Sequence, residues 1–196
     1  MTRKAAFIDR DGVLNEERAF VHRIDDFAFV PGAVEALRML KAAGYLLVVV
    51  TNQSGIARGL YSEADYLALT AHMRERLAAA GVDLDAVEYC PHLPDAAVAA
   101  YRLDCDCRKP KPGMLRRAIE ALDIEPGESF LVGDRLSDIE AGRAAGIGRG
   151  FLVRTGNALP EGSALQSDGI YDDLLACVRT VLSAGARTSA APTAQG

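Results

Sequence analysis

Short apolar segments alternate with helix-like segments along the chain, and this alternation limits the possible folds more than any other feature of the sequence. The run at 45–50 (YLLVVV) is continuous and rich in β-branched residues, as expected for a strand covered on both faces. The predicted strands are 5–8, 45–50, 129–132 and 150–154, and the predicted helices are 32–43, 62–80, 114–122, 137–145 and 172–182. The sequence therefore predicts an α/β fold, a Rossmann-like parallel sheet with right-handed crossovers and helices on both faces.

The chain has no internal repeat and no Gly/Ser-rich linker, so we expect a single domain over residues 1–184. The last segment, 185–196 (GARTSAAPTAQG), is small, polar and aperiodic, and we expect it to be a disordered tail. Two predicted loops, 12–30 and 90–113, are long for a compact domain, and such loops are often functional. Neither region has room for a large inserted cap domain, so we expect an open site.

Charge and hydrophobicity exclude several classes of protein. The 196 residues include 22 Lys and Arg against 27 Asp and Glu, a formal net charge of -5, with no basic stretch suited to a phosphate backbone. No run of about 18 apolar residues could span a bilayer, and residues 1–4 lead directly into a predicted strand rather than into a secretory signal. We therefore expect a cytoplasmic monomer that binds neither nucleic acid nor membrane.

Polar side chains directly follow three of the predicted strands. Because the carboxyl ends of parallel strands meet at one edge of a sheet, these side chains should converge there. The converging residues are Asp9, Asp11, Thr51, Asn52, Asp134 and Asp138, and the basic run 108–111 (RKPK) precedes a predicted helix. Several carboxylates at one edge would repel one another without a divalent cation, and oxygen ligands suit Mg²⁺. A hydroxyl, backbone amides and a lysine could then bind a phosphoryl group opposite the metal.

These residues also match the motifs of a known family. The segment 9–13 (DRDGV) matches the D-x-D-x-[TV] motif of haloacid-dehalogenase-type phosphatases. Thr51 matches their second motif, Lys109 the third, and Asp134 with Asp138 the acidic fourth. Each motif alone is common by chance, but all four occur here in the family's order. The chain therefore resembles this family, which implies the haloacid-dehalogenase fold and a Mg²⁺-dependent phosphoric monoester hydrolase.

The resemblance implies a role for each matching residue. Asp9 would attack phosphorus and become a transient aspartyl-phosphate. Asp11 would protonate the leaving alcohol and then activate water. The ligands of Mg²⁺ would be Asp9, the backbone carbonyl of Asp11, and Asp134, with Asp138 orienting them. The phosphoryl group would be bound by Thr51, Asn52 and Lys109.

Three of the four cysteines lie close together in the sequence, next to a histidine. The four residues of this cluster are Cys90, His92, Cys105 and Cys107. Three thiolates and one imidazole form a closed ligand set that matches a structural zinc site. The alternatives are a reduced, metal-free cluster and a redox pair. A zinc loop over residues 90–107 would fix the position of Lys109, which follows it directly. We expect Cys177, on an apolar helix face, to be a core residue.

Two further segments narrow the resemblance to one group of phosphatases within this family. Together with the cysteine cluster, 52–59 (NQSGIARG) and 107–115 (CRKPKPGML) resemble the heptose bisphosphate phosphatases of bacterial heptose synthesis. This implies hydrolysis of the C7 phosphate of D-glycero-D-manno-heptose 1,7-bisphosphate to heptose 1-phosphate and inorganic phosphate, a step toward lipopolysaccharide. It also implies that this small sugar bisphosphate contacts the segment 17–20 together with Thr51, Asn52, Gln53, Ser54, Arg108 and Arg135.

Two alternatives stay open at this point. A histidinol-phosphate phosphatase, or another small phosphomonoester phosphatase, would share the motifs and the zinc loop. A zinc-stabilised module that binds a phosphorylated ligand without catalysis is the alternative of another class. The chain also departs from the family pattern at 17–20 (ERAF), where a His-Gly-Tyr type of sequence is common, and at Arg135, where lysine is common. Both positions bear on substrate or anomer preference.

Overall fold

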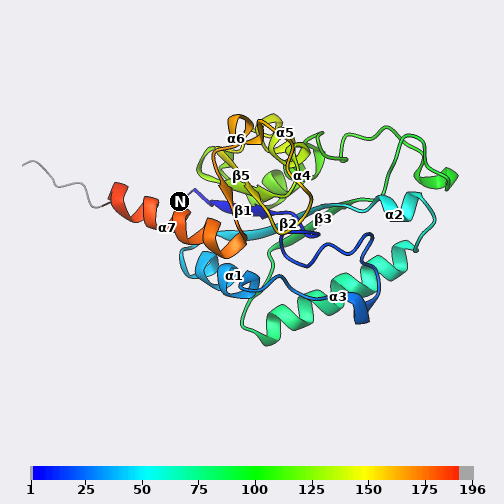
Figure 1. The fold of residues 1–196 in the computed structure, drawn as a ribbon, viewed down its shortest axis with the longest axis horizontal. Helices are drawn as coiled ribbons and strands as arrows, with labels where there is room; N and C mark the ends of the chain where they lie inside the picture. Colours follow the sequence, from blue (N-terminus) through cyan, green and yellow to red (C-terminus); the bar gives the residue numbers. More distant parts are fainter. Residues whose placement is uncertain (1, 190–196) are drawn as a thin grey trace, which may run out of the picture.

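The computed structural model describes residues 2–189 and contains a six-stranded sheet whose strands are all parallel (Figure 1). In sheet order the strands are β3 (Ala86–Cys90), β2 (Leu46–Asn52), β1 (Ala5–Ile8), β4 (Phe130–Gly133), β5 (Arg149–Val153) and β6 (Ile170–Tyr171). The chain adds β2 and β3 on one side of β1 and then adds β4, β5 and β6 on the other. Strand order therefore reverses at β1, and ligands of open α/β sheets bind at such a reversal, beyond the carboxyl ends of the strands.

Helices cover both faces of the sheet. Figure 1 shows α4 and α5 above the sheet and α1 and α7 below it. The helices are α1 (Ala33–Ala42), α2 (Ser54–Ala57), α3 (Glu63–Ala79), α4 (Gly113–Leu122), α5 (Leu136–Ala144), α6 (Ser163–Gln166) and α7 (Leu174–Ser189). Short 3-10 turns lie at η1 (Ile24–Asp26), η2 (Ala99–Tyr101) and η3 (Pro126–Glu128). Helix α3 begins with a capping box, in which Ser62 and Asp65 each bond the backbone N–H of the other.

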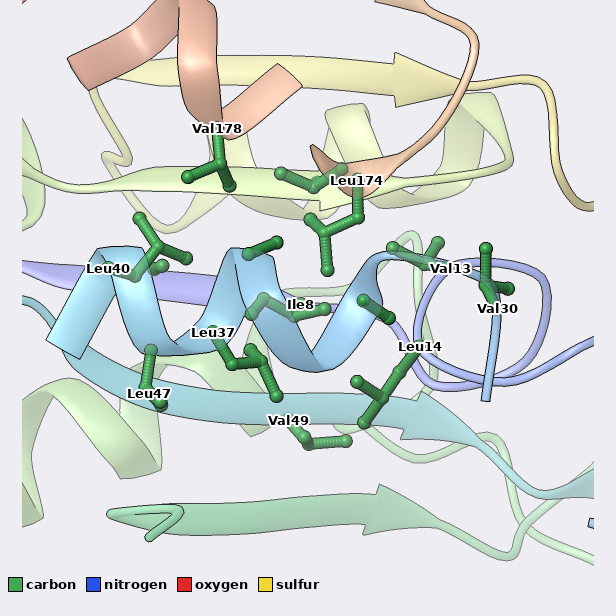
Figure 2. Packing of buried hydrophobic residues seen from close by; sticks show 14 of the residues in the cluster. Ile8, Val13, Leu14, Val30, Leu37, Leu40, Leu47, Val49, Leu174 and Val178 are labelled. Carbon is green, nitrogen blue, oxygen red and sulfur yellow. The ribbon is translucent and has the colours of Figure 1, made fainter. Parts of the chain in front are cut away.

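Each central strand is buried on both faces, as the continuous apolar runs predict. Ile8 of β1 and Val49 of β2 pack with Leu37 of α1 and Val178 of α7 (Figure 2). The next residue back in β1, Phe7, belongs to the opposite cluster with α4, because successive side chains of a strand point to opposite faces. The two apolar layers hold the sheet rigidly and thereby fix the relative positions of the strand ends.

All of the strands and helices predicted from the sequence are present, with ends displaced by at most two residues, except that α7 continues beyond its predicted end at residue 182. Strand β3 was not predicted, because its sequence AVEYC places Glu88 and Tyr89 in an edge strand that is mostly half-buried. The two-residue strand β6 and the short helices α2 and α6 were also missed. The structure differs from the tail predicted at 185–196, since α7 continues to Ser189; residues 190–196 lie outside the described residues.

The two long loops hold little regular structure. Between β1 and α1 the chain forms the turn η1, and between β3 and α4 it forms the turn η2. Within residues 2–189 no inserted cap domain covers the carboxyl edge of the sheet, in agreement with the sequence. The same part of the chain contains no helix that is long and apolar enough to cross a membrane.

Candidate active site and metal centre

The carboxyl ends of β1, β2 and β4 open into a cavity of about 620 Å³. It is lined by every predicted catalytic and substrate-binding residue outside the segment 17–20: Asp9, Asp11, Thr51, Asn52, Gln53, Ser54, Arg108, Lys109, Asp134, Arg135 and Asp138. Of the segment 17–20, the residues that line it are Glu17, Ala19 and Phe20. The sheet thus brings together side chains that the sequence scatters over more than a hundred positions.

Asp9, Asp134 and Asp138 form a buried carboxylate cluster in this cavity, because one oxygen of each lies within 4.8 Å of the others. Burial, with the charges of Asp138 and Asp134, raises the pKa of Asp9 to about 8, although Lys109 opposes the shift. Among the described residues, Oδ1 of Asp134 is buried without a hydrogen-bond partner. A cation bound here would give that oxygen a partner and would favour the ionised form of Asp9. The cluster therefore fits a Mg²⁺ ion.

Asn157 holds the other oxygen of Asp134. Its backbone N–H and its side-chain amide both donate to Asp134 Oδ2, over 2.8 and 2.6 Å. Burial raises the pKa of Asp134, and these two hydrogen bonds oppose that shift. Asn157 was not predicted as a site residue, although its place soon after the predicted strand 150–154 is a signal that the sequence contains.

Lys109 lies between two of the carboxylates and is almost fully buried. Its Nζ atom lies 2.9 Å from Asp9 Oδ1 and 2.6 Å from Asp138 Oδ1, and it donates to the carbonyl of Val50 over 2.8 Å. Burial lowers the pKa of Lys109, but Asp138 and Asp9 outweigh burial and raise it, so the ammonium stays charged. A fixed positive charge beside Asp9 can offset the charge of an incoming phosphate.

Both polar atoms of the Asn52 side chain form hydrogen bonds with the backbone of Lys109. Its Oδ1 accepts the Lys109 N–H and its Nδ2 donates to the Lys109 carbonyl, each over 3.1 Å. These residues lie 57 positions apart in the sequence, and the paired hydrogen bonds join the end of β2 to the start of the α4 region. The side-chain amide of Asn52 is therefore engaged by the backbone of Lys109. That the hydroxyl of Thr51 and the backbone amides of Thr51 and Asn52 bind a phosphoryl group stays a prediction.

Asp11 lies outside the carboxylate cluster and has its own ion-pair and hydrogen-bond partners. Arg10 forms a bidentate ion pair with it, with Nη2 2.9 Å from each carboxylate oxygen. Asn15 donates to Oδ1 over 3.1 Å and Gln53 donates to Oδ2 over 2.9 Å. The two aspartates of the D-x-D segment thus have different partners, as two carboxylates with different chemical tasks require. Arg10 and Asn15 were not predicted from the sequence as partners of Asp11.

The rim of the cavity adds positive charge next to the carboxylates. Arg135 is largely exposed and donates to Asn157 Oδ1 over 3.0 Å, and Arg108 donates to the carbonyl of His92 over 3.4 Å. Glu17 faces the same cavity; burial, together with the charge of Asp11, raises the pKa of its carboxyl. An anion and neighbouring hydroxyl groups could therefore bind at the rim.

The predicted zinc ligands also meet in space. One ligand atom from each of Cys90, His92, Cys105 and Cys107 lies within 4.8 Å of the others, and all four cysteines of the chain are free thiols. The Sγ atom of Cys107 lies 3.1 Å from both Cys90 Sγ and Cys105 Sγ, and His92 Nδ1 lies 3.4 Å from it. Three sulfurs and one imidazole nitrogen at these distances can hold a metal ion. Cys177 is remote from this cluster in the core, where burial raises its pKa to about 12.

Comparison with known proteins agrees with this geometry. A HAD-hydrolase-like family model matches residues 106–177. The chain is 51% identical over 172 residues to the D-glycero-beta-D-manno-heptose-1,7-bisphosphate 7-phosphatase of Pasteurella multocida, covering 88% of this chain and 93% of that protein. It is 47% identical over 170 residues to the enzyme of the same name from Escherichia coli K12, covering 87% of this chain and 89% of that protein.

A solved structure extends the comparison to three dimensions. The crystal structure of D,D-heptose 1,7-bisphosphate phosphatase from B. bronchiseptica, complexed with magnesium and phosphate, is similar with a TM-score of 0.78 and 36% sequence identity. The match covers 92% of this chain and 99% of that one. Identity at this level over nearly the whole length of both partners places the chain in one enzyme family, whose members are phosphoric monoester hydrolases. The chain belongs to the heptose bisphosphate phosphatases of the HAD-like hydrolase family.

Proposed function

We propose that the protein hydrolyses the C7 phosphate of D-glycero-β-D-manno-heptose 1,7-bisphosphate, releasing inorganic phosphate and the heptose 1-phosphate. The observation that most directly supports this is the pairing of Lys109 with Asp9 beside the carboxylate cluster, at the strand ends where the cavity opens. The relatives named above favour this substrate over histidinol phosphate and over a non-catalytic binding module. Their names also specify the β anomer.

In the proposed reaction Asp9 is the nucleophile. A carboxylate oxygen of Asp9 attacks phosphorus, and the bond from phosphorus to the C7 oxygen breaks as Asp11 donates a proton to that oxygen. Asp11 then removes a proton from water, which attacks the aspartyl-phosphate and releases phosphate and free Asp9. Lys109 and the hydroxyl of Thr51 stabilise the transferring phosphoryl group.

Mg²⁺ would be held by Asp9, Asp134 and the backbone carbonyl of Asp11, with Asp138 positioned by Lys109 and by the backbone N–H of Arg135. When bound, it supplies positive charge to the phosphoryl oxygens. The unpartnered oxygen of Asp134 and the raised pKa of Asp9 support this assignment. The solved structure of the B. bronchiseptica enzyme contains magnesium and phosphate.

The second metal is zinc in this proposal, held by Cys90, His92, Cys105 and Cys107. Four protein ligands leave no position for water, so the ion has a structural task. The loop it closes continues directly into Arg108 and Lys109, and Arg108 also donates to the carbonyl of His92. Zinc would thereby fix both the phosphoryl-binding lysine and one rim arginine.

Arg108 and Arg135 would bind the phosphate that stays on the sugar, and Ser54 and the segment 17–20 would contact its hydroxyl groups. Arginine suits this task because its planar guanidinium pairs with phosphate oxygens through two hydrogen bonds. Both arginines line the same cavity as Asp9, and the rim is open because no cap domain lies within the described residues.

The deciding experiment measures Mg²⁺-dependent phosphate release from both anomers of the heptose bisphosphate and from histidinol phosphate. We expect the β bisphosphate to give the highest kcat/KM, and Asp9→Asn to reduce release by about 10³-fold or more, as loss of a nucleophile does. Equal or reversed preference for histidinol phosphate would contradict the substrate assignment. Unchanged release by Asp9→Asn would contradict the covalent mechanism.

A further inference from the structure

The side chain of Gln53 lies in the cavity wall but is only 1% exposed. It follows β2 directly, and each of its polar atoms has two partners within the protein. Nε2 donates to Asp11 Oδ2 and to Thr51 Oγ1, both over 2.9 Å. Oε1 accepts from the hydroxyl of Tyr61 over 2.6 Å and from Arg10 Nη2 over 3.4 Å. The amide has two donor hydrogens and two acceptor positions, and all four are in use.

The orientation of the amide is fixed by its neighbours. Arg10 can only donate, and burial raises the pKa of the Tyr61 hydroxyl, so it remains a donor. Two donors on one side require the oxygen of Gln53 to face them, which directs the NH₂ group toward Asp11 and Thr51. The network therefore links the proposed acid/base to the hydroxyl proposed to bind the phosphoryl group.

The tyrosine that holds Gln53 is itself tightly packed. The ring of His22 stacks on it with centroids 4.9 Å apart and planes 5° apart. The backbone of Gly55 also approaches the ring so closely that an added Cβ there would overlap it. A ring with so little freedom keeps its hydroxyl in one place.

The hydroxyl group of Thr51 is oriented by its hydrogen bond with Gln53. Its oxygen accepts from the NH₂ group of Gln53, which has no acceptor position to offer in return. The hydroxyl hydrogen of Thr51 must therefore point away from Gln53. A phosphoryl oxygen in the cavity is the partner that the proposed reaction supplies.

We propose that Gln53 is a positioning residue that fixes the carboxyl of Asp11 and the hydroxyl of Thr51 relative to one another, with Tyr61 holding Gln53 in place. This inference rests on the proposed function, because it takes Asp11 as the acid and Thr51 as a phosphoryl ligand. It changes the expected role of Gln53, whose side chain has no hydrogen-bonding capacity left for the sugar bisphosphate.

The test uses the leaving group of the substrate. An alkyl C7 oxygen needs a proton as it leaves, whereas p-nitrophenolate does not, so a displaced Asp11 slows only the first substrate strongly. A displaced Thr51 slows both substrates alike, because both transfer the same phosphoryl group. In variants that keep Arg108 and Arg135, the ratio of kcat/KM for the heptose bisphosphate to kcat/KM for p-nitrophenyl phosphate therefore reports the position of Asp11 and not that of Thr51.

Tyr61→Phe removes the hydroxyl and keeps the ring, and Gln53→Met removes the amide and keeps the length. We expect Tyr61→Phe to lower this ratio about 10-fold and Gln53→Met to lower it further, within the range of general acid catalysis. Tyr66→Phe is the matched control, since Tyr66 packs in the same aromatic cluster but has no hydrogen bond to Gln53 among the described contacts. We expect it to leave the ratio within about twofold, below the effect of a lost general acid.

Equal loss on both substrates in the Tyr61 and Gln53 variants would overturn the inference, as would an equal effect of Tyr66→Phe. Should Gln53→Met fail to fold, Tyr61→Phe decides the outcome by itself. Asp11→Asn separates the two proposals. If it lowers the ratio and the Tyr61 variant does not, the positioning role alone is wrong; if it leaves the ratio unchanged, the acid role of Asp11 is wrong and the inference falls with it.

Discussion

Asn157 donates its backbone N–H and its side-chain amide to the same oxygen of Asp134, over 2.8 and 2.6 Å, while the other oxygen of that carboxylate stays buried without a hydrogen-bond partner in the described structure. One oxygen is thus fixed by the protein, and the other is the one that the proposed Mg²⁺ site would use. Hydrogen bonds to metal-binding carboxylates orient them and tune their affinity.

Asn157→Ala is therefore expected to weaken Mg²⁺ binding. The concentration of Mg²⁺ that gives half-maximal phosphate release should rise by about 10- to 100-fold, as is typical when such a supporting residue is lost. Titration of activity with MgCl₂ measures this. At saturating Mg²⁺ the KM for the bisphosphate should be nearly normal; a changed KM with unchanged Mg²⁺ dependence would show that Asn157 acts on the substrate instead.

The stability of the metal-free protein is expected to fall as pH rises from about 4 to 8. The raised pKa of Asp9, about 8 against an ordinary 3.8, means that the folded protein binds more protons than the unfolded chain in this window. The free energy of unfolding then decreases with pH, by linkage. Thermal unfolding in EDTA at several pH values should show the decrease.

The control for this prediction is Asp9→Asn, which cannot titrate at that position and should have a weaker pH dependence in the same window. Added MgCl₂ should also reduce the dependence in the wild-type protein, because a bound cation stabilises ionised Asp9. Identical pH profiles for the variant and the wild type in EDTA would contradict the assignment.

Purified protein is expected to contain about one zinc per chain, since the ligand set is that of one closed site. Cys105→Ser should lose the zinc and lower the melting temperature, because binding free energy at such a site contributes to folding. Cys177→Ala is the matched control, as its thiol lies in the core away from the cluster. Elemental analysis of the three proteins measures this, and zinc-free wild-type protein with full activity would refute it.

Arg135→Ala is expected to raise the KM for the bisphosphate about 10-fold, the loss typical of one charge-assisted phosphate contact. For p-nitrophenyl phosphate, which has no second phosphate, the change should be much smaller. Arg154→Ala serves as the control, because Arg154 is equally exposed but pairs with Asp172 and does not line the cavity. A similar rise for both substrates would place Arg135 at the transferred phosphate rather than at the retained one.

The fold class, the ends of the central strands and both candidate metal sites could be predicted from the residues alone. Strand and helix periodicities are local patterns, so 5–8 and 32–43 were predicted almost to the residue. Residues that follow the strands of a parallel sheet converge at one edge, so the sequence predicts that Asp9, Thr51 and Asp134 meet. The three cysteines and His92 likewise lie within one short segment, so the sequence predicted that their side chains form a single site.

The hydrogen-bond partners of the site residues, in contrast, become visible only in the folded protein. Asn52 meets Lys109 across 57 positions, and Asn157 meets Asp134 across 23, separations far longer than the period of a helix or a strand, so no local pattern pairs these residues. The family resemblance implied that Gln53 contacts the substrate, and in the structure its buried amide has four hydrogen-bond partners inside the protein. The physical reason is common to all three: hydrogen-bond partners are selected by proximity and burial, and both arise only when distant strand ends are packed into one sheet.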